Sequence, residues 1–228
     1  MISGLLEHFK MDQLIFKFPF SKKYYEQDFF VSSNNFSAFK LIEGWPTWPG
    51  KWLNIFGDSG SGKTHLAKIL EKKINKIKII ESKKINDEII EDLRNLDCLI
   101  IDSYDNDINE KTLYSILNQS KQLDNYVLIN SISSINNINF ELNDLKSRIN
   151  SFLFIGIELP TDDLLRVIIS KTLSDKQISI NPKVSDFIIN NVERSYEKMF
   201  KFLKDVDELS LSTGKSININ LIKKVLNQ

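Results

Sequence analysis

Residues 52–64 read Trp-Leu-Asn-Ile-Phe-Gly-Asp-Ser-Gly-Ser-Gly-Lys-Thr, and this stretch decides the fold. The first five residues form a short apolar run that is typical of a buried strand. The last eight match the pattern G-x-x-x-x-G-K-[ST] in full, and a helical pattern follows them. In this context the glycines allow backbone N–H groups to surround an anion at the helix N-terminus. The sequence therefore predicts a phosphate loop at residues 57–64.

The phosphate loop predicts a nucleotide site. Lys63 is expected to contact the β- and γ-phosphates, and the Thr64 hydroxyl is expected to bind Mg²⁺. His65 follows directly and is included among the candidates, although packing within the helix is its simpler role. The cofactor is therefore ATP or ADP with Mg²⁺, and the residue types do not choose between the two. The candidate nucleotide ligands in and beside the loop are Gly57, Asp58, Ser59, Gly60, Ser61, Gly62, Lys63, Thr64 and His65.

A second part of the site is expected at Asp102. This residue follows the apolar run at 98–101, which reads as a buried strand. A phosphate loop needs an acid that holds the metal and its water shell, and an aspartate at a strand end suits that role. We expect Asp102 to be this acid, the Walker B aspartate, and with Thr64 to form the Mg²⁺ site.

Strand and helix patterns alternate up to residue 160. We expect strands at 52–56, 77–80, 98–101, 126–129 and 152–157, and helices at 64–73 and 110–123. This alternation predicts an α/β fold in which helices cover both faces of a parallel, five-stranded sheet. After Pro160 only helical patterns occur, at 161–174, 182–191, 194–211 and 218–227. We therefore divide the chain into an N-terminal arm (1–28), an α/β core (29–159) and a helical domain (160–228).

Composition narrows the classes of function. The 228 residues carry 30 basic and 30 acidic side chains, so a whole-chain electrostatic footprint for nucleic acid is absent and direct sequence-specific DNA binding is not expected. Cys98 is the only cysteine, which excludes a disulfide framework. No apolar run approaches the ~18 residues that cross a membrane. We expect a cytoplasmic protein with no membrane partner.

Several further motifs resemble the AAA+ ATPases of the DnaA replication-initiator group, and within it the Hda subfamily of DnaA regulatory inactivators. The resemblance covers nearly the whole chain and implies an AAA+ core followed by a small α-helical lid. The motifs are Phe30-Val31 with Asn35 and Ala38, Trp45-Pro46-x-Trp48-Pro49 as in alphaproteobacterial members, His65-Leu66-Ala67, Leu145-Lys146-Ser147-Arg148, Pro160-x-Asp162 with Leu165-Arg166, and Val192-Glu193-Arg194-Ser195-Tyr196.

The resemblance implies roles for three positions. Arg148 would be an arginine finger that acts in trans, in the nucleotide site of a neighbouring molecule. Arg194 would reach the phosphates of this chain from the lid. Either Asn130 or Ser131 would be the sensor I residue, and the sequence does not decide between them. The simpler alternatives are a surface arginine on a helix for Arg148 and an ion pair within the lid for Arg194.

Two departures from the family pattern bear on function. DnaA carries a C-terminal DNA-reading domain, whereas only a short stretch follows Arg194 here, which favours a regulator over an initiator. Ser103 follows Asp102, where efficient AAA+ ATPases carry an acid that orients the attacking water. We therefore expect weak intrinsic ATPase activity.

The N-terminal arm contains Gln-Leu-Ile-Phe-Lys-Phe at 13–18. This run resembles the peptides by which bacterial replication proteins hold the sliding clamp of DNA polymerase III. An extended peptide offers a polar Gln for hydrogen bonds and apolar side chains for a groove. The alternatives are an arm that folds on its own core and an arm that is covered by a second copy in a homodimer. The candidate clamp-binding residues are Gln13, Leu14, Phe16 and Phe18.

The resemblance as a whole implies a nucleotide-binding AAA+ regulator of replication initiation. It would dock on the clamp and present Arg148 to the ATP held by DnaA, so that hydrolysis leaves DnaA inactive and prevents re-initiation. Two alternatives stay open. One is a self-contained ATPase motor or helicase-loader-like protein, which Ser103 disfavours. The other is a non-catalytic tether between the clamp and DnaA.

Overall fold

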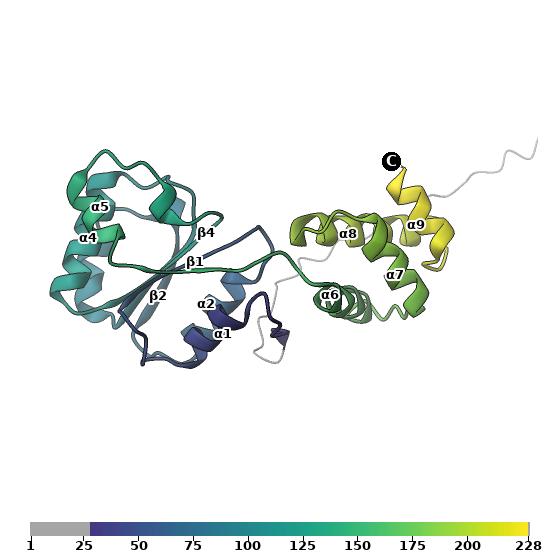
Figure 1. Ribbon diagram of the computed structural model, residues 1–228, viewed down its shortest axis with the longest axis horizontal. Helices are drawn as coiled ribbons and strands as arrows, with labels where there is room; N and C mark the ends of the chain where they lie inside the picture. Colours follow the sequence, from purple (N-terminus) through teal and green to yellow (C-terminus); the bar gives the residue numbers. More distant parts are fainter. Residues whose placement is uncertain (1–27, 228) are drawn as a thin grey trace, which may run out of the picture.

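The computed structural model describes residues 28–227. An α/β domain and a helical domain lie beside one another, and the stretch 157–161 connects them (Figure 1). The candidate clamp-binding residues Gln13, Leu14, Phe16 and Phe18 lie outside the described residues. In the part that is described, no helix is both long and apolar enough to cross a membrane.

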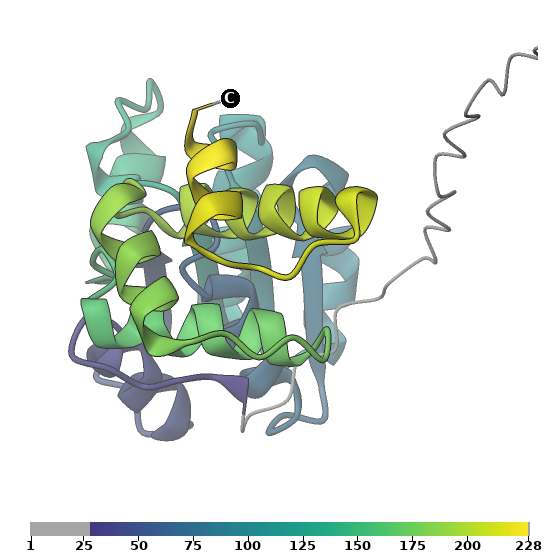
Figure 2. The same cartoon turned by 90° about the vertical axis from the view of Figure 1, so that its right-hand side faces the viewer.

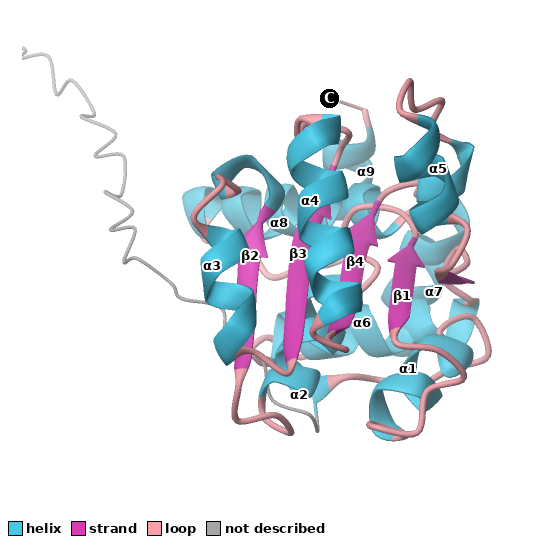
Figure 3. Ribbon diagram, turned by 90° about the vertical axis from the view of Figure 1, so that its left-hand side faces the viewer, coloured by secondary structure: helices cyan, strands magenta, loops and turns pink. Residues whose placement is uncertain are grey.

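The sheet of the α/β domain has five parallel strands, as expected, and their order is β2-β3-β4-β1-β5. Because all strands run in one direction, their carboxyl ends share one edge (Figure 3). Strand β1 lies between β4 and β5, so the loop that follows it meets the end of β4. The strands are β1 (Trp52–Phe56), β2 (Ile77–Glu81), β3 (Cys98–Tyr104), β4 (Tyr126–Ser131) and β5 (Leu153–Gly156).

Helices cover both faces of the sheet. α1 (Phe36–Glu43) and α2 (Lys63–Glu71) pack on one face, against a core that includes Cys98 and Ile100. The opposite face carries Leu99 and Ile101, because successive strand residues point to opposite sides. Figure 3 shows the three helices on this second face in front of the strands. They are α3 (Ile89–Asp92), α4 (Glu110–Gln122) and α5 (Asn143–Ile149), and single 3₁₀ turns lie at η2 (Ser82–Lys84), η3 (Leu93–Asn95) and η4 (Ile135–Asn137).

The helical domain has a hydrophobic core of its own, and Figure 2 looks onto this domain with the sheet behind it. Three of its helices begin at a side-chain cap, because Thr161, Asn181 and Asn218 each accept a hydrogen bond from a backbone N–H of the first turn. The helical patterns expected after residue 160 are confirmed. The helices are α6 (Asp162–Ser174), α7 (Pro182–Asn191), α8 (Tyr196–Thr213) and α9 (Ile219–Leu226).

The end of β3 differs from the expectation. Ile101 pairs with Ile129, but Tyr104 pairs with Ser131. Two residues of β3 therefore lie between these pairs, whereas only one residue of β4 does. Ser103 is the extra residue of this β-bulge and has a φ of 58°. The bulge places the Tyr104 side chain in the same core cluster as Ile101. Asp102 therefore lies within the strand and does not end it.

Candidate functional site

The phosphate loop joins the end of β1 to the start of α2 and is attached to the end of β4. The Gly57 N–H donates to the carbonyl oxygens of Ser131 (3.3 Å) and Ile132 (3.0 Å). Gly57 has a φ of 153°, and a Cβ at this position would lie 2.7 Å from the carbonyl oxygen of Ile157. Only glycine therefore allows β1 to turn into the loop this close to the chain that leaves β5.

Lys63 folds back over the loop. Its Nζ donates to the carbonyl oxygens of Gly57 (2.6 Å) and Asp58 (2.8 Å) and to Ser61 Oγ (3.3 Å). Burial lowers the pKa of the Lys63 ammonium, and the carboxylates of Asp102 and Asp58 partly oppose that shift. A partly buried cation that neutral carbonyls hold is well suited to bind an anion.

Thr64, Asp102 and Asn130 come together beside this lysine. Thr64 Oγ1 donates to one oxygen of Asp102 (2.9 Å), and Asn130 Nδ2 donates to the other (2.8 Å). Asp102 and Asn130 are both buried. A hydroxyl and a carboxylate side by side are hard oxygen ligands of the kind that Mg²⁺ takes. The expected pair, Thr64 and Asp102, is thus adjacent in the structure.

Asn130 carries an unpaired acceptor. Its Oδ1 is buried and has no hydrogen-bond partner. An orphaned buried acceptor costs roughly 1–3 kcal/mol, so it is typical of a site that a ligand or its water completes. Ser131 differs, because its Oγ accepts from Asn54 Nδ2 (2.9 Å) and donates to the Ser133 carbonyl (2.7 Å). Of the two candidates for sensor I, only Asn130 contacts Asp102.

Asn54 is a site residue that the sequence reasoning missed. It is fully buried in β1, and its amide donates to the Ile129 carbonyl (2.9 Å) and to Ser131 Oγ (2.9 Å). Its Oδ1 accepts from the Ile135 N–H (3.1 Å). Asn54 therefore holds the segment after β4 that in turn accepts from Gly57. The available signal was a single polar residue inside an otherwise apolar strand.

Three other candidates lie at the margin of this arrangement or away from it. His65 contacts the Phe29 ring edge to face, with the centroids 5.3 Å apart. Arg148 donates to Asn118 Oδ1 (2.8 Å) and lies on α5, which packs on the face of the sheet opposite α2. Arg194 forms an ion pair with Asp162, and about half of each side chain is exposed. The structure therefore contains the ion pair within the helical domain that was the simpler alternative for Arg194.

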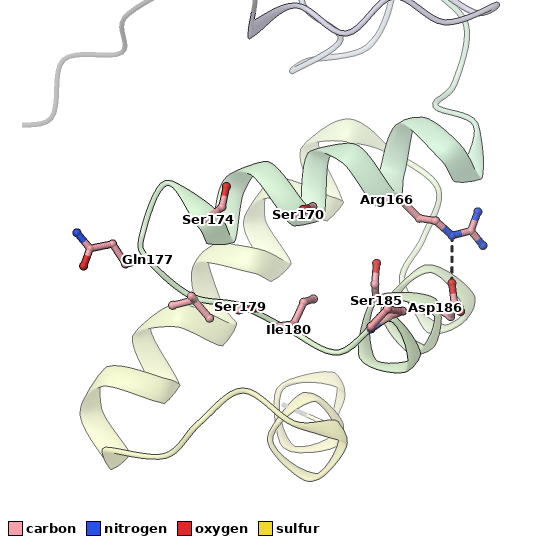
Figure 4. A pocket seen from close by; sticks show the side chains of 10 residues that line it. Arg166, Ser170, Ser174, Gln177, Ser179, Ile180, Ser185 and Asp186 are labelled. Atoms are coloured by element: carbon pink, nitrogen blue, oxygen red, sulfur yellow. Dashed lines mark hydrogen bonds and ion pairs between the residues drawn. The ribbon is translucent and has the colours of Figure 1, made fainter.

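A cavity of about 540 Å³ lies elsewhere, between α6, α7 and their connection (Figure 4). The one basic residue in its lining, Arg166, is paired with Asp186 (Nε to Oδ1, 3.1 Å) and with Asp163 (3.1 Å). The cavity therefore offers no unpaired charge to an anion. Across residues 28–227, moreover, no group of three or more His, Cys, Asp or Glu side chains is arranged for a metal ion.

Known proteins resemble both parts of the chain. The family profile "Hda, lid domain" matches residues 162–226. The chromosomal replication initiator DnaA of a Buchnera aphidicola subspecies is 28% identical over 249 residues, which cover 96% of this chain and 54% of that protein. Domain III of Thermotoga maritima DnaA has the same fold, with a TM-score of 0.74, 20% identity and coverage of 92% of this chain and 98% of that chain. The chain is therefore similar in sequence to DnaA over most of its length, and its fold is that of DnaA domain III, an AAA+ fold.

One further protein resembles the chain in sequence and one further solved structure resembles it in fold. A Haemophilus influenzae protein described only as uncharacterized is 24% identical over 185 residues, which are 76% of this chain and 80% of that protein. The structure of AMPPCP-bound DnaA from Aquifex aeolicus has a TM-score of 0.66 and 18% identity, and the match covers 85% of this chain and 68% of that one. The chain spans about half the length of the Buchnera initiator. Its helical domain resembles the lid of Hda.

Proposed function

We propose that this protein binds an adenine nucleotide with Mg²⁺ and regulates replication initiation by acting on DnaA. The observation that carries the proposal is the contact of Thr64 and Asn130 with the two oxygens of Asp102, next to Lys63. The orphaned Oδ1 of Asn130 supports a site that a ligand completes. The solved DnaA structure with AMPPCP supports an adenine nucleotide as that ligand.

The residues present fit a magnesium nucleotide. Mg²⁺ would neutralise charge on the phosphate oxygens. In this proposal Thr64 and Asp102 hold the metal, the N–H groups of residues 57–62 hold the phosphates, and Lys63 exchanges its carbonyl acceptors for phosphate oxygens. Asn130 keeps the Asp102 carboxylate in place through its amide. Ser103 contributes no carboxylate, so hydrolysis by the isolated chain is slow.

Arg148 acts in trans in this proposal, on ATP that DnaA holds. Its position supports this role, because α5 and α2 lie on opposite faces of the sheet and Arg148 is partly exposed. A finger that is supplied in trans is worth about 10³–10⁵ in rate, because its guanidinium neutralises charge that develops on the transferred phosphoryl group. Arg194 would serve the nucleotide of this chain by exchanging Asp162 for a phosphate.

Docking on the sliding clamp through Gln13, Leu14, Phe16 and Phe18 completes the proposal. The support is the sequence pattern alone, since these residues precede the described part of the chain. Asp28, the last residue of the arm, is ion-paired with Lys171 of α6. This residue therefore lies beside the helical domain.

The test is hydrolysis of DnaA-bound ATP in the presence of clamp loaded on DNA. The full chain should accelerate hydrolysis, and Arg148→Ala should lose about 10³-fold or more of the acceleration while it still binds nucleotide. Arg148→Lys should rescue poorly, because an ammonium lacks the planar fork of arginine.

Lys146→Ala is the matched control, since Lys146 is an exposed basic residue on the same helix. Full acceleration by Arg148→Ala would remove the arginine from the mechanism. Binding of DnaA and clamp without any acceleration would favour the tether.

A further inference from the structure

The helical domain touches the phosphate loop at Tyr196. This residue begins α8 and is 3% exposed. A Cβ on Gly60, in the middle of the phosphate loop, would lie 3.2 Å from Tyr196 Cβ and 3.3 Å from Cδ2 of Phe200. The first turn of α8 therefore packs directly on the backbone that would surround the phosphates.

The hydroxyl of Tyr196 ties three segments together. It accepts a hydrogen bond from Asn34 Nδ2 and donates to the Glu158 carbonyl oxygen (3.4 Å). Asn34, which is 5% exposed, also donates to the Glu158 carbonyl oxygen through its side-chain amide (3.2 Å). The backbone carbonyl of Asn34 in turn accepts from the Glu158 N–H (3.1 Å). The segment before α1, the connection to the lid and the start of α8 thus meet at one buried phenol.

Arg194 is held much less firmly, although it is only two residues away. Its contact is the ion pair with Asp162, in which the two side chains are 54% and 46% exposed. Exposed ion pairs contribute little to stability, so a phosphate can replace Asp162 at small cost. The Arg194 backbone, in contrast, lies only two residues before the buried Tyr196.

We propose that Tyr196 is a positioning residue, which Asn34 and Glu158 hold against Gly60 so that Arg194 faces phosphates bound in the loop. The inference rests on the nucleotide binding proposed above and names the residue that brings the lid to that site. Burial, with a contribution from the Asp58 carboxylate, raises the pKa of Tyr196 to about 12. The hydroxyl therefore stays protonated, and able to donate, throughout the neutral range.

The test is a pair of substitutions in the full chain, with ADP and AMPPCP affinities measured by calorimetry. Arg194→Ala should weaken binding about fivefold or more, which is the lower end of typical coupling between sites. Tyr196→Phe should weaken binding comparably, and the double variant should bind no more weakly than Arg194→Ala alone. Tyr126→Phe is the matched control, because it also removes one phenol hydrogen bond, to the Pro46 carbonyl (2.9 Å), at the opposite end of the sheet. It should leave affinity and the effect of Arg194→Ala unchanged.

A purely structural Tyr196 gives a different result. Tyr196→Phe would then lower the melting temperature, as Tyr126→Phe does, and Arg194→Ala would cause its full loss in both backgrounds; that outcome overturns the inference. Parent-like affinity of Arg194→Ala overturns it as well. If Tyr196→Phe does not fold, Asn34→Ser removes the amide donor while it keeps the tyrosine, and the same loss is expected. A parent chain that binds neither nucleotide refutes the proposed function itself, and the inference with it.

Discussion

Asn54→Leu tests whether a buried amide, remote from any phosphate, supports the nucleotide site. Leucine has the same branching as asparagine, is somewhat larger and cannot hydrogen-bond. The change removes both donor bonds of the amide and leaves the Ile135 N–H without its acceptor. The segment after β4, which accepts from Gly57, then loses its main side-chain attachment to β1.

The expected loss of stability follows from these three bonds. A buried N–H without a partner costs about 1–3 kcal/mol, and each of the other two bonds contributes about 1 kcal/mol. Burial of the leucine side chain offsets about 2 kcal/mol of this. The net destabilisation is about 2 kcal/mol, which lowers the melting temperature of a chain of this size by roughly 4–8 °C. We also expect nucleotide affinity to fall about threefold or more, because a threefold loss corresponds to only about 0.7 kcal/mol of lost loop fixation.

Thermal melts with and without ADP measure both effects. Asn125→Leu is the matched control, because Asn125 is a buried asparagine that donates to the Leu93 carbonyl (2.8 Å), just before β4 begins. It should lower the melting temperature but preserve the rise that ADP produces. If Asn54→Leu melts like the parent, the three hydrogen bonds of Asn54 do not stabilise the fold by the expected amount. If it is destabilised yet binds ADP like the parent, Asn54 does not support the loop.

Three other expectations concern the site and the core. Ser103→Asp should raise ATP hydrolysis by the isolated chain, because it restores an acid after Asp102, whereas Ser103→Ala should not; rapid hydrolysis by the parent would contradict this and favour the motor alternative. Because burial lowers the pKa of Lys63 below 10.5, its ammonium loses its proton at a lower pH than a free lysine does. Affinity measured upward from pH 7 should therefore begin to fall before the pH reaches 10.5, while Lys63→Ala should bind weakly at every pH; a profile in the parent that stays flat up to pH 10.5 would refute the role of the charge. Cys98 is fully buried and burial raises the pKa of its thiol, so a thiol reagent should label it only after unfolding, and labelling of the native chain at the same rate would be the contrary result.

Much of the fold could be predicted because the hydrophobic periodicity of the helices and strands is clear in this chain. The strand expected at 52–56 is β1, and the helices expected at 110–123 and 182–191 end within one residue of α4 and α7. The helices α1, α3 and α5 were missed, since four to eight residues are too few for a clear 3.6-residue period. The bulge in β3 was also missed, because serine is not one of the residue types in which a positive φ is common.

The part of the candidate site that lies within one sequence motif could be predicted. The part that depends on contacts between distant segments could not. The loop and Asp102 follow from a pattern with a known mechanism, and the structure brings Thr64 and Asp102 together. The choice between Asn130 and Ser131 depends on which side of β4 each faces. The hydrogen bonds of Asn54, and the one between Tyr196 and Asn34, join segments more than 70 residues apart, which no local pattern encodes.

The bulge at Ser103 allows the side chain at this position to change with little effect on the stability of the fold. Ser103 is exposed and is the extra residue in the pairing of β3 with β4, so neither hydrophobic cluster of the α/β domain includes it. Exchanging its side chain therefore disturbs no packing, and the main restriction is the left-handed backbone, which accepts glycine, asparagine and aspartate more readily than β-branched residues. An acid can therefore be introduced here with little penalty in folding. If position 103 has the role expected from the sequence, turnover can be changed at this residue without a matching change in stability.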